Sequence, residues 1–180
     1  MPASATSLQQ IRVAPVHLVP GAGVLDLQVT AEQRAYVGDI ALNVLDAHRD
    51  PLSDAMVVLA GARAIGFYRL DRAPGTVCGR ELDEPTLGLR ALFIDQRVQG
   101  RGYGSAAIRA CCQDARERHP DRHLLLLAVH CRNRAAISTY LRAGFHDTGE
   151  RLAGGDAGEQ QLMLKRLRSA QPADPAPAWT

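Results

Sequence analysis

A glycine-rich, cationic turn lies at residues 97–104, immediately before a segment with helical periodicity. Gly100, Gly102 and Gly104 carry no Cβ, so successive backbone N–H groups there are free to face one anion. The start of a helix adds unpaired N–H donors and partial positive charge. The side chain of Arg101 adds a full charge. These residue types at this spacing favour binding of a phosphate or pyrophosphate group.

Three kinds of nucleotide site use such a turn, and the neighbouring residues separate them. A nucleoside triphosphate loop requires the triplet GK[ST], which does not follow these glycines. A dinucleotide fingerprint fits imperfectly through Gly100, Gly102 and Ser105, but it requires an acidic residue after the next strand. That strand ends at His130 and Cys131, which excludes this class. A cradle for the pyrophosphate of coenzyme A and an ordinary structural turn remain as interpretations.

The composition limits the classes of protein to which the chain can belong. Its 180 residues are 46% hydrophobic, which is enough for one domain with a core. A net charge of +2 gives no signal for nucleic acid or for a membrane surface. The apolar runs are too short to span a bilayer, and the N-terminus lacks the pattern of a signal peptide. We therefore expect a soluble, cytoplasmic protein without nucleic-acid or membrane partners.

The cysteines and histidines show no spacing that is typical of a metal site. Cys78, Cys111, Cys112 and Cys131 include no CxxC pair, so they match no zinc-binding pattern. Reduced and mostly buried thiols are expected instead. No metal is predicted.

Periodicity and capping signals predict the elements that position the glycine turn. Thr30 and Gln33 form a capping box, which predicts a helix through about His48. Apolar residues recur with helical spacing after Gly104, and this helix is expected to end before Pro120. Alternating apolar segments and turn residues predict the strands. Strands are expected at 16–20, 55–60, 63–70, 87–94, 124–129, 145–150 and 159–167, a further helix at 134–143, a loop at 71–86 and a turn at 154–156.

This order of elements is that of an α/β (α+β) protein with a mixed sheet. Residues 87–129 form a predicted strand–helix–strand crossover, so its two strands are expected to be parallel neighbours. The run LLLLAV at 124–129 is apolar without alternation, as in a strand buried on both faces. We expect one domain over residues 11–168, with disordered ends at 1–10 and 169–180.

A second motif follows the glycine turn after one helix and one strand. "NRAAISTYLRAGF" occupies residues 133–145, and "LFIDQRVQGRGYG" occupies residues 92–104. Together they resemble the GNAT superfamily of acyl-CoA-dependent N-acetyltransferases, and Gln99, Gly102 and Gly104 match its pyrophosphate signature. The resemblance covers roughly residues 30 to 167. It implies a mostly antiparallel sheet with a central parallel strand pair, flanked by helices.

The resemblance also implies a site for acetyl-CoA as co-substrate, with no metal. The backbone of Leu92, Phe93 and Ile94 would hold the pantetheine arm and the thioester carbonyl. Asn133 stands where the family places a side chain that contacts the cofactor, and it also fits the N-cap of the following helix. The complete implied cofactor site is Leu92, Phe93, Ile94, Gln99, Gly100, Arg101, Gly102, Tyr103, Gly104, Ser105, Asn133 and Ala136.

Tyr140 stands where the family has its general acid. Thioester cleavage expels a thiolate, and a phenol with a pKa of about 10 is able to donate a proton to it. The alternative is an aromatic side chain that only packs on the sheet. No glutamate lies on the predicted strand 87–94, where many family members have a base, so the base is left open between His130, water, and the carboxylates Glu81, Asp83, Glu84 and Glu150.

The acceptor is expected to be a primary amine of a small molecule. Four stretches resemble the bacterial diamine and polyamine (spermine/spermidine) acetyltransferases, whereas Ile40 and Asn43 depart from that branch. These stretches are 27–37, 64–70, 147–150 and 158–167. A polyamine would require carboxylates along a groove to hold its ammonium groups. The candidates are Asp39, Asp46, Asp50, Asp54, Glu81, Asp83, Glu84 and Glu150.

Other acceptors and another class of protein remain as alternatives. The departures at Ile40 and Asn43 are compatible with a different small amine, an amino-acid derivative or an antibiotic amine. A protein N-terminus or lysine is a further acceptor. The chain could also bind an acyl-CoA without turnover, as a sensor or structural subunit, although it keeps Tyr140, Gly102 and Gly104. By analogy with the family, a homodimer is the expected assembly.

Overall fold

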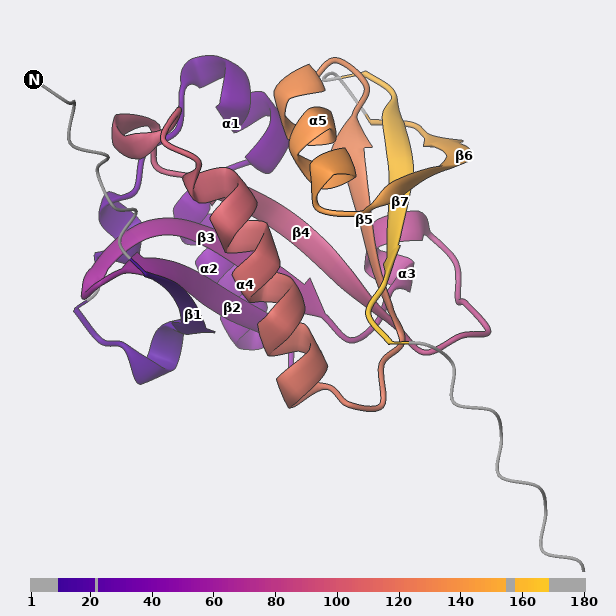
Figure 1. The fold of residues 1–180 in the computed structure, drawn as a ribbon, viewed down its shortest axis with the longest axis horizontal. Coiled ribbons are helices and arrows are strands. Elements are labelled where there is room, and N and C mark those ends of the chain that lie inside the picture. Colours follow the sequence, from indigo (N-terminus) through magenta and orange to yellow (C-terminus); the bar gives the residue numbers. More distant parts are fainter. Residues whose placement is uncertain (1–9, 22, 155–157, 169–180) are drawn as a thin grey trace, which may run out of the picture.

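The protein is built on one seven-stranded sheet, described here from a computed structural model (Figure 1). The structure describes residues 10–21, 23–154 and 158–168. The strand order is β1-β2-β3-β4-β5-β7-β6, with every neighbouring pair antiparallel except β4 and β5. The predicted fold class and parallel pair are therefore confirmed. The strands are β1 (Ile11–Pro15), β2 (Ser53–Ala60), β3 (Arg63–Asp71), β4 (Thr86–Ile94), β5 (Leu124–His130), β6 (His146–Leu152) and β7 (Gln160–Arg166).

Helices cover both faces of this sheet. One face carries α4 and α5, which cross in front of the strands in Figure 1, and the other carries α2 and α3. Helix α1 lies over the end of β4, across from α5. None of the helices in the described ranges is long and apolar enough to cross a lipid bilayer. The helices are α1 (Ala31–Val37), α2 (Ile40–Arg49), α3 (Gly75–Cys78), α4 (Tyr103–Arg118) and α5 (Arg134–Arg142).

The two sides of the core follow from the alternation of side chains along β2. Met56 and Val58 face α4, whereas Val57 and Leu59 face α2 on the other side of the sheet. All four side chains are almost fully buried. Helix α4 buries one face against the same core as Met56, as its apolar spacing predicts. The sheet therefore holds the start of α4 rigidly.

Two predictions about the N-terminal elements are wrong. The first strand lies at Ile11–Pro15, where it pairs along its whole length with β2, and the segment expected as a strand begins with a 3-10 turn at Val16–Leu18. The single helix expected from the capping box is divided into α1 and α2. Gly38 ends α1 with a φ of 75°, and the Asp39 side chain caps α2 by accepting from the N–H of Leu42 at 2.9 Å.

The remaining differences are small. The segment expected as a loop at 71–86 contains the short helix α3. The predicted disordered ends lie outside the described residues, apart from Gln10 at one end of the described range. The same holds for the turn at 154–156, of which only Gly154 is described.

A bulge in β4 separates this strand from β5 at the carboxyl end of the parallel pair. The ladder joins Thr86–Leu89 to Leu124–Leu127 and goes no further. Just beyond it, the register between β3 and β4 shifts by one residue, and Ala91 takes a positive φ of 50°. An extra residue of this kind bends the bulged strand. Beyond Leu89, β4 therefore keeps its pairing with β3 but has no strand partner on its β5 side.

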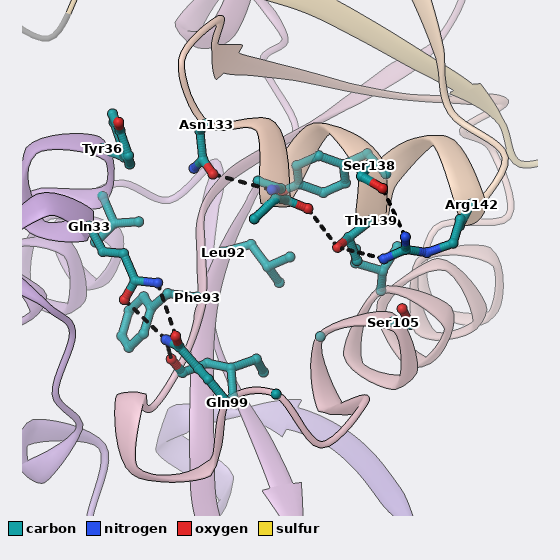
Figure 2. A pocket seen from close by; sticks show the side chains of 18 of the residues that line it. Gln33, Tyr36, Leu92, Phe93, Gln99, Ser105, Asn133, Ser138, Thr139 and Arg142 are labelled. Carbon is teal, nitrogen blue, oxygen red and sulfur yellow. Dashed lines mark hydrogen bonds between the residues drawn. The ribbon is translucent and has the colours of Figure 1, made fainter.

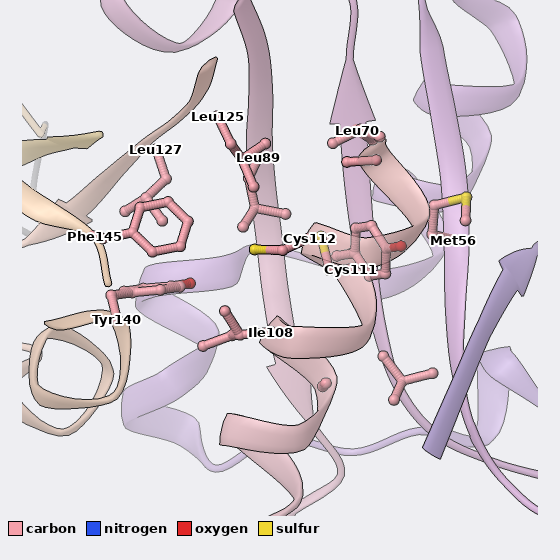
Figure 3. Packing of buried hydrophobic residues seen from close by; sticks show 14 of the residues in the cluster. Met56, Leu70, Leu89, Ile108, Cys111, Cys112, Leu125, Leu127, Tyr140 and Phe145 are labelled. Carbon is pink, nitrogen blue, oxygen red and sulfur yellow. The ribbon is translucent and has the colours of Figure 1, made fainter. Parts of the chain in front are cut away.

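The core beneath α4 contains ionisable groups that are kept neutral by burial (Figure 3). Burial raises the pKa of the Cys111 thiol and the pKa of the Tyr68 phenol well above their ordinary values. The Tyr68 hydroxyl lies beside Cys111 but makes no hydrogen bond of acceptable geometry. Both groups are thus uncharged in the folded protein at neutral pH.

We expect the free energy of unfolding to fall as the pH rises above about 8.5. Thiols and phenols of the unfolded chain release protons there while the buried groups keep theirs, so the slope of stability against pH is negative. Urea unfolding between about pH 7 and about pH 10 measures this slope. Tyr68→Phe is expected to be at least as stable as the parent at neutral pH and to flatten the slope near pH 10. An unchanged slope in this variant would exclude the phenol as its source.

Candidate active site

The gap beside β4 opens into a cavity of about 570 Å³ (Figure 2). Its walls are the glycine turn with the start of α4, the carboxyl end of β4, one side of α5, and α1. Both motifs found in the sequence border this one cavity. The lining residues are Gln33, Tyr36, Val37, Leu92, Phe93, Ile94, Gln99, Gly100, Gly102, Gly104, Ser105, Ile108, Asn133, Ala135, Ala136, Ser138, Thr139, Tyr140 and Arg142.

The glycine turn has the backbone geometry of an anion cradle. Gly100 and Gly102 have φ values of 76° and 82°, which side-chain-bearing residues rarely adopt. Gly102 is the N-cap of α4 and has no side chain to cap it. The first bond into the helix runs from the N–H of Ala106 to Gly102, at 3.2 Å. Within the described chain, no N–H from Gly100 to Ser105 donates to a protein acceptor, so these donors are available to a ligand.

The pyrophosphate of coenzyme A fits this cradle, and its pantetheine arm fits the opened end of β4. The unpaired N–H groups suit two phosphates, and the helix behind them favours negative charge. Leu92, Phe93 and Ile94 line the cavity next to the turn, beyond the last residue that pairs with β5. A bound arm would find backbone groups there in the position of a missing strand.

Helix α5 forms the opposite wall and begins at Asn133. The side chain of Asn133 caps the helix by accepting from the N–H of Ala136 at 3.2 Å. Both residues also line the cavity, so the cap leaves the side-chain amide nitrogen of Asn133 on the cavity side (Figure 2).

Tyr140 projects from α5 toward α4, with its hydroxyl on the side of Ile108 and Cys112 (Figure 3). Its side chain packs edge-on against Phe145, with ring centroids 5.5 Å apart. Only 7% of the residue is exposed, but it borders the cavity, and no hydrogen bond of its hydroxyl is found in the described structure. Burial raises the pKa of Tyr140 well above that of an exposed phenol. The hydroxyl therefore stays protonated at neutral pH.

Three of the residues expected at the site do not line the cavity. Arg101 is exposed, and Tyr103 packs against the core beneath α4. His130 is buried at the end of β5. Its Nδ1 lies 3.2 Å from the carbonyl oxygen of Gly158, which only accepts, so Nδ1 carries the proton. Its Nε2 then accepts from the side-chain amide of Gln160 at 2.9 Å.

The cavity also contains residues that sequence reasoning missed. Gln33 and Tyr36 come from α1, and the Tyr36 ring lies 5.2 Å from that of His130. Arg142 donates to Ser138 at 2.8 Å and to Thr139 at 3.3 Å along the α5 wall. Starting at Ala135, the missed residues of α5 recur every three or four positions and so lie on one face of the helix. This spacing was the sequence signal by which they could have been found. The missed residues are Gln33, Tyr36, Val37, Ile108, Ala135, Ser138, Thr139 and Arg142.

The expected carboxylates lie elsewhere, and no Asp or Glu is among the described lining residues. Asp54 pairs with Arg72 at 3.1 Å, and Asp39 caps α2. Glu150 of β6 pairs with Arg80 at 2.8 Å. These carboxylates balance nearby cations or helix ends. In the described ranges, no group of three or more His, Cys, Asp or Glu is arranged to hold a metal ion.

Comparison with known proteins places the chain in a family. The sequence profile of the Acetyltransferase (GNAT) family matches residues 29–145, which include both motifs. The resemblance inferred from those motifs is thereby confirmed.

Curated relatives and solved structures agree with this placement. Spermine/spermidine N(1)-acetyltransferase of Bacillus subtilis (strain 168) is 27% identical over 150 residues, covering 81% of this chain and 91% of the relative. The fold is shared with aminoglycoside acetyltransferase AAC(6')-Ib in complex with coenzyme A (TM-score 0.64, 17% identity, 87% of this chain and 94% of that chain). It is also shared with a chimera of Vibrio cholerae spermidine N-acetyltransferase SpeG and hSSAT (TM-score 0.61, 16% identity, 88% and 96%). The chain belongs to the GNAT family and is an acetyl-CoA-dependent acetyltransferase.

Proposed function

We propose that the chain transfers the acetyl group of acetyl-CoA to a primary amine of a small molecule, with a diamine or polyamine as the favoured class. One observation supports this above the others: a single cavity joins the glycine turn, the opened end of β4 and Tyr140. The similarity to a spermine/spermidine acetyltransferase supports the polyamine class.

Acetyl-CoA supplies an activated thioester. Residues of this chain would hold its pyrophosphate and its thioester-bearing arm. The N–H groups from Gly100 to Ser105 would bind the pyrophosphate, with Arg101 screening its charge. Backbone groups of Leu92 to Ile94 would hold the arm and orient the thioester carbonyl toward the amine. Asn133 would add a side-chain contact from α5.

Tyr140 is the proposed general acid. The neutral amine attacks the thioester carbon and a C–N bond forms. As the C–S bond breaks, the departing thiolate takes the proton of the Tyr140 hydroxyl, and the nitrogen, which then carries one proton more than an amide, returns that proton to the Tyr140 phenolate directly or through water. The amine must first lose a proton, because an alkyl ammonium has no lone pair. His130 is the proposed acceptor of that proton through water. Its Nε2 becomes available when the Gln160 amide turns away.

The lining of the cavity bears on the class of acceptor. A polyamine carries several positive charges, and the described lining offers it hydroxyls, amides and the Tyr36 ring, together with the cation Arg142 on the α5 wall, rather than carboxylates. A cation is able to bind over an aromatic ring, so recognition by Tyr36 is compatible with a polyamine. Aminoglycosides and monoamines are the other classes of acceptor to be compared with polyamines.

An amine panel tests the proposed function. Release of free thiol from acetyl-CoA is measured with spermidine, spermine, a diamine, an aminoglycoside and a monoamine. We expect acceptor-dependent release, with the largest kcat/KM for a diamine or polyamine. Release only with the aminoglycoside would move the chain to another acceptor class. Binding of coenzyme A without release for any amine or for a lysine-containing peptide would instead favour a sensor that does not turn over.

A further inference from the structure

Two glutamine side chains join α1 to the glycine turn at the edge of the cavity (Figure 2). Gln33 Nε2 donates to Gln99 Oε1 at 3.1 Å, and Gln99 Nε2 donates back to Gln33 Oε1 at 3.0 Å. The two residues are 66 positions apart in the sequence. Such a reciprocal amide pair fixes both side chains more firmly than a single bond would.

The side-chain atoms of this pair also make two further hydrogen bonds. Gln99 Nε2 donates its second hydrogen to the carbonyl oxygen of Ile94 at 2.6 Å. That carbonyl only accepts, so the nitrogen of Gln99 must face it and the orientation of the amide is fixed. Gln33 Oε1 also accepts from the N–H of Thr30 within the capping box. The Gln99 side chain is therefore committed to α1 and β4, and it is not free to bind a phosphate.

Few contacts made by α1 itself hold its N-terminal half, although the segment before it is anchored by buried Val29 and by the hydrogen bond from the Gln96 N–H to the Gln28 carbonyl oxygen. Helix α1 has seven residues, and none of them is buried. In the described structure, Gln33 is the only α1 side chain that hydrogen-bonds outside the helix and its cap. The C-terminal half is held by Val37, which packs on the cluster around Phe93, and by the Tyr36 ring over His130. Within the helix, the Gln33–Gln99 pair is thus the side-chain link between the N-terminal half of α1 and the residue next to Gly100.

We propose that Gln33 is a positioning residue which couples α1 to the cofactor turn. When the turn binds coenzyme A, the Gln33–Gln99 pair stabilises α1 as the wall of the cavity that the acceptor meets. Tyr36, one helical turn along from Gln33, gains this constraint in addition to its contact with His130. This inference rests on the proposed function, since it needs the glycine turn to bind coenzyme A.

Hydrogen exchange of the full chain, with and without coenzyme A, tests the coupling. In the parent, coenzyme A is expected to slow exchange at residues 99–105 and also at residues 31–37. In Gln33→Leu, slowing at 99–105 persists and slowing at 31–37 is lost. The loss of one net hydrogen-bonded contact is expected to weaken coenzyme A binding roughly fivefold and to raise the KM of the acceptor by a similar factor, with kcat changed less.

Three matched variants separate the coupling from simple loss of helix. Gln33→Glu keeps an acceptor for Gln99 Nε2 and for Thr30, so it is expected to restore part of the protection. Thr30→Val removes the other half of the capping box but leaves the amide pair, so coenzyme A still slows exchange in α1. Gln28→Leu removes an exposed Gln28–Gln96 bond between the same two parts of the chain and is expected to change nothing.

The outcomes discriminate between the coupling and the proposed function. Protection of 31–37 in Gln33→Leu equal to that in the parent, or its absence in the parent despite protection at 99–105, would overturn the coupling alone. No protection at 99–105 in the parent would overturn the cofactor site on which the proposed function rests. If Gln33→Leu proves unfolded by circular dichroism, the comparison of Gln33→Glu with Thr30→Val decides.

Discussion

Replacing Tyr140 with phenylalanine is expected to lower kcat by about 100-fold or more, with the KM for acetyl-CoA nearly unchanged. The substitution removes only the hydroxyl, which makes no hydrogen bond with the residues that the structure describes. The ring would keep its edge contact with Phe145 and its place in the core. The thiolate would then leave without a proton donor, which slows the chemical step and not the binding. Steady-state kinetics with the best amine of the panel measures both constants.

The pH dependence gives this prediction a second readout. Because burial raises the pKa of Tyr140, its hydroxyl stays protonated up to and beyond the ordinary phenol pKa of about 10. The rise of kcat/KM with pH should therefore follow loss of a proton from the amine, and the same rise should remain in Tyr140→Phe at a lower level. Tyr68→Phe is the matched control, since Tyr68 is also buried but does not line the cavity. Equal kcat in the parent and Tyr140→Phe would remove Tyr140 from its role.

Local chemistry explains which parts of the fold were predictable. The capping box at Thr30 and Gln33 lies within four residues and forms as the sequence predicts. The strand–helix–strand crossover follows from handedness rules and from the apolar run in β5. The first strand was missed because its position depends on β2, which pairs Ile11 with Ala60 and Pro15 with Met56. Register between distant segments is a tertiary property, which the pattern of Val16 and Leu18 does not contain.

The same distinction holds for the site. Residues inside the two motifs, such as Gly102 and Tyr140, reach the cavity because each motif carries its own local geometry. Gln33 and Tyr36 reach it only because the fold brings α1 to the end of β4, so spacing along the chain could not indicate them. His130 was placed correctly at the end of its strand, but its ring is held by β7 through Gln160 and by Gly158. Pairing between β5 and β7 decided that orientation.

The cofactor site itself is tested most directly by a negative charge at the start of α4. Gly104→Asp is expected to raise the Kd of coenzyme A by at least about 100-fold. A Cβ at this position would meet nothing closer than Thr139 Cγ2 at 3.9 Å, so the fold should accept the side chain. An acidic residue in the first helical turn is favourable by roughly 0.3–1 kcal/mol, so the melting temperature is expected to stay the same or rise. Loss of binding would then occur in a protein that is no less stable.

The size of the effect follows from electrostatics. Two unit charges about 4 Å apart repel by about 4 kcal/mol at an effective dielectric constant near 20, and each 1.4 kcal/mol is worth about tenfold in Kd. Solvent at the open side of the turn reduces this repulsion, which leaves about 100-fold as the lower bound. Gly104→Ala adds a Cβ without charge and is expected to cost far less. Gln113→Glu adds a negative charge on the exposed face of the same helix, and calorimetry should find its affinity close to that of the parent. Tight binding by Gly104→Asp would mean that the pyrophosphate lies elsewhere, because a carboxylate and a diphosphate cannot share these N–H donors.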